Sequence, residues 1–270
     1  MLRTVAIHAQ GLRHDAGALI AALAVGAAVA GHLIGGTGAT FVALALFAAG
    51  ILHGAADEGR HDIVAFSVVH AGGYVAFAAA IAALYLASPL LGLAAFLAIS
   101  GWHFAISPAD FDRASRYAIA GCAIGGSALF HPAPTAEVFA AITGLAIPGA
   151  AMQPLAIVGA GGVALAGLAA ARRANGMWQA ILAVLAVILL EPVLAVALIF
   201  FVAHALPVQR EQIADHGLDR VLKAIAPTGI PALAGAIALI ALAWLGYVAL
   251  PLAAAIAIGV ATPHMLTERL

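Results

Sequence analysis

Nearly unbroken runs of apolar residues, each close to the length of a bilayer crossing, dominate this 270-residue chain. A helix needs about 20 apolar residues to cross the hydrocarbon core, and backbone polar groups there have no water to bond. The pattern therefore predicts membrane-spanning helices and not strands. The expected spans are residues 17–34, 39–56, 63–86, 89–107, 114–130 and 150–171, followed by two longer stretches, 177–206 and 229–264.

The two longer stretches are too long for a single untilted crossing. Residues 177–206 would form a helix of about 45 Å at 1.5 Å per residue, and Glu191–Pro192 lies in its middle. Proline removes a backbone hydrogen bond from a helix, so we expect broken helices near Pro192 and near Pro251. The sequence thus predicts an all-α polytopic integral membrane protein, a bundle of about eight transmembrane helices forming one domain over residues 1–270.

The composition requires a bilayer as the solvent of this chain. Hydrophobic residues make up 65% and charged residues 9%, with a mean hydropathy of +1.11, whereas soluble domains are about 45–50% apolar and about 25% charged. A net charge of −1 offers no electrostatic footprint for nucleic acid. The single cysteine, Cys122, leaves no disulfide framework and no thiolate metal site.

The basic residues lie in alternate connections between the expected spans. Those that precede the first span or follow the second, fourth and sixth are Arg3, Arg13, Arg60, Arg113, Arg116, Arg172 and Arg173. The other connections, near 35–39, 87–88 and 131–149, hold no Lys or Arg. Because short cytoplasmic loops are enriched in these residues, we expect a multi-pass protein of the inner (cytoplasmic) membrane with a cytoplasmic N-terminus and no cleavable signal peptide.

Five of the apolar runs end in a short polar signature that contains a histidine. The signatures are HGAADE (53–58), SGWHFAISPAD (100–110), LFHPAPT (129–135), FVAHALPVQ (201–209) and TPHMLTE (262–268). Imidazole is the usual ligand of first-row metals, and nearby carboxylates orient it. A histidine at a helix end can instead bond the last free carbonyls. Both interpretations are open for each residue, and the recurrence of the pattern favours a common metal site for His53, His103, His131, His204 and His264.

Carboxylates and aromatic side chains accompany these histidines. Asp57 stands four residues after His53 and shares its helix face, and Asp110 follows His103 at a turn. The aromatic residues flanking His103 are Trp102, Phe104 and Phe111. They suit either the walls of an apolar binding site or anchors at the membrane interface. Glu191, deep in an apolar run, suits either a helix break at an interface or a buried polar anchor.

Taken together, the signatures resemble those of the Brp/Blh family, the bacterioopsin-related membrane β-carotene 15,15′-dioxygenases. The resemblance covers about residues 45–268 and is carried by HGAAD, SGWHF with a following Asp, LFHPAPTAEVF and TPHM. It implies an enzyme that binds iron(II) through histidines and splits the central double bond of β-carotene, or of a similar apolar polyene, with O2. The implied product is retinal, and the implied setting is the lipid bilayer.

The resemblance also implies roles for individual residues. His53, His103 and His204 would be the catalytic iron ligands, with His264 as a further ligand. The implied surrounding groups are Asp57, Glu58, Asp110 and His131, and the implied substrate contacts are Trp102, Phe104 and Phe111. Two positions depart from the family pattern: Glu58 replaces the second histidine of HGAxDH, and Val208 replaces the second histidine of WHSxRH. We therefore expect a divergent member whose site has three histidines or is completed by His264 or a carboxylate.

Two other classes of function remain open from the sequence. Scattered histidines and aspartates with a broken helix at Pro192 would suit a proton- or metal-coupled transporter, but no inverted repeat is visible and the histidines lie at helix ends. The loss of a histidine at Val208 would suit a non-catalytic carotenoid- or retinal-binding protein, or one associated with a rhodopsin. Metal with product formation would identify the enzyme, pigment without product the binding protein, and vesicle flux the transporter.

Overall fold

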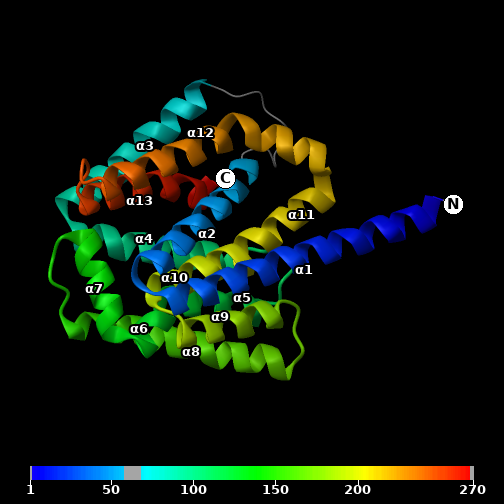
Figure 1. Cartoon of the computed structure of the whole chain (residues 1–270), viewed down its shortest axis with the longest axis horizontal. Helices are drawn as coiled ribbons and strands as arrows, with labels where there is room; N and C mark the ends of the chain where they lie inside the picture. Colours follow the sequence, from blue (N-terminus) through cyan, green and yellow to red (C-terminus); the bar gives the residue numbers. More distant parts are fainter. Residues whose placement is uncertain (1, 58–67, 268–270) are drawn as a thin grey trace.

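Every regular element in the described part of the chain is a helix, and the prediction of an all-α polytopic membrane protein is confirmed (Figure 1). The computed structural model describes the backbone of residues 2–57 and 68–267 and the side chains of 16–54, 69 and 71–266. Within those ranges six helices are long and apolar enough to cross a membrane. The α-helices are α1 (Leu2–Ile34), α2 (Gly36–Asp57), α3 (Val68–Ala87), α4 (Pro89–Ile106), α5 (Arg113–Gly121), α6 (Ser127–Phe130), α7 (Pro132–Thr143), α8 (Met152–Ala171), α9 (Met177–Leu189), α10 (Pro192–Leu198), α11 (Leu206–His216), α12 (Leu218–Trp244) and α13 (Leu250–Thr267).

Two π-helical segments and one 3-10 turn join some of these helices into longer rods. The π-segment η1 (Cys122–Gly126) links α5 to α6, and the π-segment η3 (Ile199–Ala205) links α10 to α11. The 3-10 turn η2 (Gly149–Ala151) leads into α8. Because of η3, the chain from 192 to 216 forms one continuous helical rod, which is among the candidate membrane spans.

The expected break near Pro192 is present and reverses the chain. Leu190 and Glu191 are extended, with ψ angles of 157° and 155°, and Pro192 is the first residue of α10. Proline suits that position because the first N–H of a helix has no partner within the helix. The rod of α10, η3 and α11 then packs against α9 and runs back alongside it. His204 is thereby carried toward the end of the bundle where α2 and α4 end.

The last apolar stretch is also divided, although its first helix starts earlier than predicted. Five residues without helical assignment, 245–249, separate α12 from α13, and Pro251 is the second residue of α13. Helix α12 begins at Leu218 and not at residue 229, and it contains Pro227 and Pro231. The charged residues of its first turns obscured this start, because a hydropathy pattern registers only the apolar part of a helix.

Helix α7 occupies part of the segment 131–149, which was predicted only as a connection between spans. Pro132 opens α7, and Gly144 closes it in a left-handed conformation with φ of 71°. That conformation is nearly free of cost for glycine and costly for other residues. The helix has 12 residues, about 18 Å at 1.5 Å per residue, which is too short to span a bilayer.

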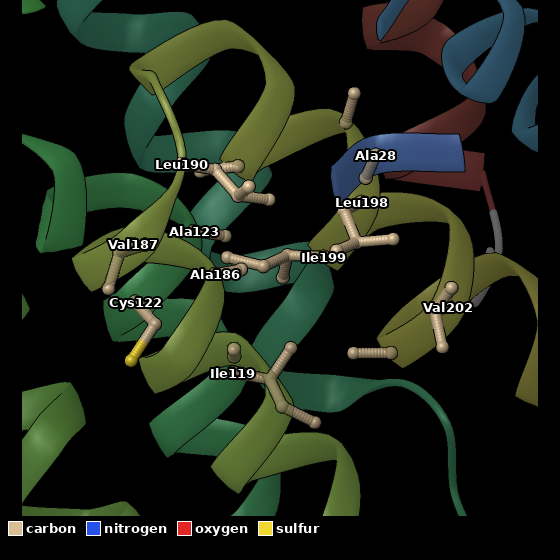
Figure 2. Close-up of a cluster of buried hydrophobic side chains, with 14 of the residues drawn as sticks. Ala28, Ile119, Cys122, Ala123, Ala186, Val187, Leu190, Leu198, Ile199 and Val202 are labelled. Carbon is tan, nitrogen blue, oxygen red and sulfur yellow. The ribbon is translucent and has the colours of Figure 1, made fainter. Parts of the chain in front are cut away.

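The rod that carries His204 lies at the centre of the bundle. In the most apolar part of this rod 61% of the residues are buried, compared with 6% in the corresponding part of α12. Side chains from α1, α5, α9 and the rod meet in one cluster (Figure 2). The labelled members include Ala28, Ile119, Val187, Leu198 and Val202. This packing fixes the rod, so His204 stands on the most constrained element of the fold.

Helix α8 crosses the rod of α5, η1 and α6 with the two backbones in direct contact. A Cβ built on Gly159 would lie 2.5 Å from the carbonyl carbon of Gly125, and one built on Gly125 would lie 2.5 Å from the nitrogen of Gly159. Backbone atoms cannot step aside as a flexible side chain can. Small residues allow this close approach in membrane bundles.

Replacing Gly159 by alanine is expected to destabilise the protein by about 1–3 kcal/mol, because the added methyl group forces the two helices apart. Gly161, on the same helix, has open space where its Cβ would be, so Gly161→Ala is the matched control and should leave stability unchanged or raise it slightly. Thermal unfolding in detergent compares the two variants. Equal unfolding temperatures would contradict the proposed crossing.

Candidate metal centre

Three buried histidines from separate elements meet near one end of the bundle. His53 lies in the last turns of α2, His103 in the last turn of α4, and His204 in η3. Their exposed fractions are only 2%, 3% and 0%. One ligand nitrogen from each ring lies within 4.8 Å of the others, and the Nε2 atoms of His103 and His204 are 2.9 Å apart. This spacing is small enough for a single metal ion to contact all three rings.

Backbone carbonyls determine which nitrogen two of these rings present to the centre. His53 Nδ1 lies 2.5 Å from the Gly50 carbonyl oxygen, and His204 Nδ1 lies 3.3 Å from the Ser107 carbonyl oxygen. A carbonyl oxygen can only accept, so each Nδ1 must carry the hydrogen. In a neutral imidazole the other nitrogen then has the lone pair. Both rings are therefore prepared to donate Nε2 to a metal.

The ring of His264, from α13, borders the same three histidines. Its centroid is 5.1 Å from that of His53 and 5.3 Å from that of His103. Gly54 makes this approach possible, because a Cβ there would lie 2.8 Å from atoms of the His264 ring. The glycine that follows His53 in the HGAAD signature thus has a steric purpose. The structure brings four of the five signature histidines together.

The wide turn of η3 places His204 at the centre. Pro207 has no N–H, so the carbonyl of Ala203 lacks its usual helical donor. The preceding residue forms a π-type bond, from the N–H of Leu206 to the carbonyl of Phe201. Single π turns are frequent at functional sites. Pro207 stands three residues after His204, where its missing N–H removes one α-helical bond beside the wide turn.

Two phenylalanines enclose the histidines on their apolar side. The ring of Phe104 is 4.6 Å from that of His204, and the ring of Phe200 is 5.4 Å from that of His53. Phe200 approaches α2 where Gly50 leaves room, since a Cβ on Gly50 would lie 2.7 Å from its Cδ1 atom. Phe104 was predicted from its neighbour His103, whereas Phe200 was missed. Its position four residues before His204, on the same helix face, could have identified it.

The other predicted residues near His103 lie elsewhere. Trp102 faces outward with 45% of its surface exposed, and Phe111 packs against Gly176 in the connection before α9. Asp110 is exposed, and its contacts are made by its main chain. The side chain of Asp57 and the whole of Glu58 fall outside the described residues, so the structure gives their predicted roles no test.

His131 lies far from the other four signature histidines. It follows α6, and its Nε2 atom is 3.2 Å from the carbonyl oxygen of Ile188 near the end of α9. The rod of α5, η1 and α6, of about 27 Å at 1.5 Å per residue, separates it from the loop that follows His103. It lines a pocket of about 530 Å³ with His32, Glu137 and Glu191. The structure thus places His131 at the opposite end of the bundle and not beside the histidine cluster.

The fold and this centre define a class, the polytopic membrane proteins with a buried histidine cluster able to hold a metal. A comparison of the sequence with models of known protein families identifies the particular family. The model of the β-carotene 15,15′-dioxygenase family matches residues 44–269, and the chain belongs to this family. The resemblance found in the sequence is thereby confirmed, and the family is one of carotenoid dioxygenases. Comparisons with curated proteins and with solved structures gave no match.

Proposed function

We propose that the chain is an iron(II)-dependent oxygenase that cleaves the central double bond of β-carotene, or of a similar apolar polyene, to retinal with O2. The observation that carries this proposal is the convergence of buried imidazoles from α2, α4, η3 and α13 in a chain of the β-carotene dioxygenase family. We assign His53, His103 and His204 as metal ligands and His264 as a fourth.

The donor set suits iron. Imidazole nitrogen suits iron, copper, nickel and zinc alike, so the donors fit iron, and the choice of iron among these metals rests on the dioxygenase family. Neutral imidazoles leave the positive charge of the ion uncompensated, and a site with three or four protein ligands keeps positions open. Iron(II), when bound there, would supply the oxygen chemistry of the cleavage.

The surrounding residues would orient the ligands and exclude water. The Gly50 and Ser107 carbonyls hold two of the rings in the Nε2-donating form, which is the usual arrangement around metal-bound histidine. The rings of Phe104 and Phe200 present apolar surface beside the ligands. A neutral polyene dissolves in the bilayer, so it would reach such a centre from the lipid and be recognised by shape and not by charge.

We also propose that the metal end of the bundle faces the cytoplasm. The loop after α4 is hydrogen-bonded to the loop after α8 through the N–H of Asp112 and the carbonyl of Asn175. The two loops therefore share one end, and they lead to or contain Arg113, Arg116, Arg172 and Arg173. Basic loops are cytoplasmic. His264, near the end of α13, borders the same centre, so a protein fused after Leu270 reports the side on which this end lies. A fused green fluorescent protein should fluoresce, and a fused alkaline phosphatase should be inactive. The reverse result would contradict the orientation.

The test of the proposed reaction is the production of retinal in a bacterial host that already makes β-carotene. We expect retinal, measured by chromatography, in cells with the wild-type chain and only the background of the empty host with His53→Ala. Immunoblots of the membrane fraction control for the amount of protein. Intact β-carotene beside abundant wild-type protein would exclude this cleavage and favour a pigment-binding role.

A further inference from the structure

Two neighbouring residues of α11, Glu211 and Gln212, contact the two other segments that carry ligands. The side-chain Nε2 of Gln212 donates to the backbone carbonyl of His53 at 3.4 Å, and Gln212 is only 1% exposed. A carboxylate oxygen of Glu211 accepts from the N–H of Asp110 at 3.1 Å. Asp110 lies in the loop that follows His103. One short stretch of α11 therefore contacts both α2 and the loop that follows α4.

The same helical rod supplies the third ligand. Helix α11 continues η3 without a break, so His204 is rigidly connected to Glu211 and Gln212. Successive residues of a helix point about 100° apart, since a turn holds 3.6 residues. This angle allows one side chain to reach α2 while the next reaches the loop. One rigid helical rod therefore carries His204 and contacts the segments next to His53 and His103, so it can fix the relative positions of the three imidazoles.

The loop of residues 107–112 is held from a second side by Asn175. The side-chain amide of Asn175 donates to the backbone carbonyl of Asp110 at 2.7 Å. The backbone carbonyl of Asn175 accepts from the N–H of Asp112 at 3.1 Å. The carbonyl of Ser107, at the start of this loop, accepts a hydrogen bond from the Nδ1–H of His204. The loop that Glu211 and Asn175 fix therefore also orients the ring of His204.

We propose that Glu211, Gln212 and Asn175 are positioning residues that set the spacing of the histidines and thereby the affinity for metal. This proposal rests on the proposed function only in requiring that the histidines bind a metal. Both α2 and α4 end close to the centre, where helix termini fray unless other groups hold them. A ligand set keeps its affinity only when its supports hold each ring to within about 0.5 Å. The three side chains supply those supports from outside α2 and α4.

The experiment is a Co²⁺ titration of the full chain, purified in detergent without a histidine tag, followed by visible absorption. The variants are Gln212→Met and Glu211→Met, which remove the donor to His53 and the acceptor for Asp110 with little change in volume. Gln209→Met and Asp215→Leu likewise replace an amide and a carboxylate by apolar groups elsewhere on α11 and are the matched controls. We expect Gln212→Met and Glu211→Met to weaken cobalt binding about 10–100-fold, the usual effect of losing groups that orient metal ligands, and to alter the cobalt spectrum. The controls should match the wild type in both.

Thermal unfolding of the metal-free protein separates positioning from general stability. We expect the two variants to unfold within the range of their controls while their cobalt spectra differ. Wild-type affinity and spectrum in both variants would overturn the proposal. A lowered unfolding temperature with an unchanged spectrum would also overturn it, because the residues would then be structural only. A wild-type chain that binds no cobalt would overturn this proposal and the metal site together, whereas bound cobalt without retinal would reject only the reaction.

Discussion

The variant His204→Ala is expected to lose metal binding and retinal formation together. His204 is fully buried, and its Nε2 atom lies 2.9 Å from that of His103, so its removal takes away a donor that no water can easily replace. Loss of groups that merely orient ligands already costs about 10–100-fold in metal affinity, and we expect loss of a ligand to cost more than about 100-fold. Cobalt titration and the retinal assay in β-carotene-producing cells measure the two effects.

The variant His131→Ala provides the control for this experiment. His131 belongs to a signature of the same kind, but its ring contacts the Ile188 carbonyl at the opposite end of the bundle. It should therefore bind cobalt with wild-type affinity and spectrum. Equal losses of metal in His131→Ala and His204→Ala would show that the cluster is not the metal site.

The different fates of these two histidines show what the sequence could and could not provide. Each ends an apolar run, so local pattern alone treats them alike. The alternation of basic connections carried more information: residues 131–149 hold no Lys or Arg, whereas the connections after His53 and His103 do. Applied to His131, that contrast would have placed its signature on the other side of the membrane from His53 and His103, whereas the prediction grouped all five histidines at one site.

The break near Pro192 was predicted from chemistry, and it decided where His204 lies. A continuous helix over 177–206 would have carried His204 away from His53. The prediction succeeded because Pro192 opens α10 at the position where its missing N–H costs nothing, whereas Pro227 and Pro231 lie inside α12 without ending it. The wide turn of η3 lies beside Pro207, but the direction of the His204 ring depends on packing against α2 and α9, which local pattern does not contain.

The polar supports of the centre could not be predicted, because they join residues far apart in the chain. Gln212 and His53 are separated by 159 positions, and Glu211 and Asp110 by 101. In the sequence, the segment around Gln212 has the polar composition of a loop between spans. Only the fold shows that it extends the helix of His204 and turns one polar side chain inward. Partners of this kind are selected by proximity and leave no local pattern.

The final prediction concerns His264 and the position where the family has a second histidine. Val208 is fully buried and lies four residues after His204, where side chains on one helix face are neighbours. We expect His264→Ala to weaken cobalt binding and to reduce retinal formation, because His264 supplies the donor that Val208 lacks. Adding Val208→His to His264→Ala should restore a large part of the cobalt affinity.

The size of the new side chain requires its own control. A larger group in a fully buried position costs about 1–3 kcal/mol through overpacking, so Val208→Leu in the His264→Ala background measures that cost without adding a donor. Restoration by histidine but not by leucine would assign His264 to the metal and explain how a divergent member retains a complete site. If His264→Ala alone binds cobalt as the wild type does, three histidines suffice and the ring of His264 only borders the centre.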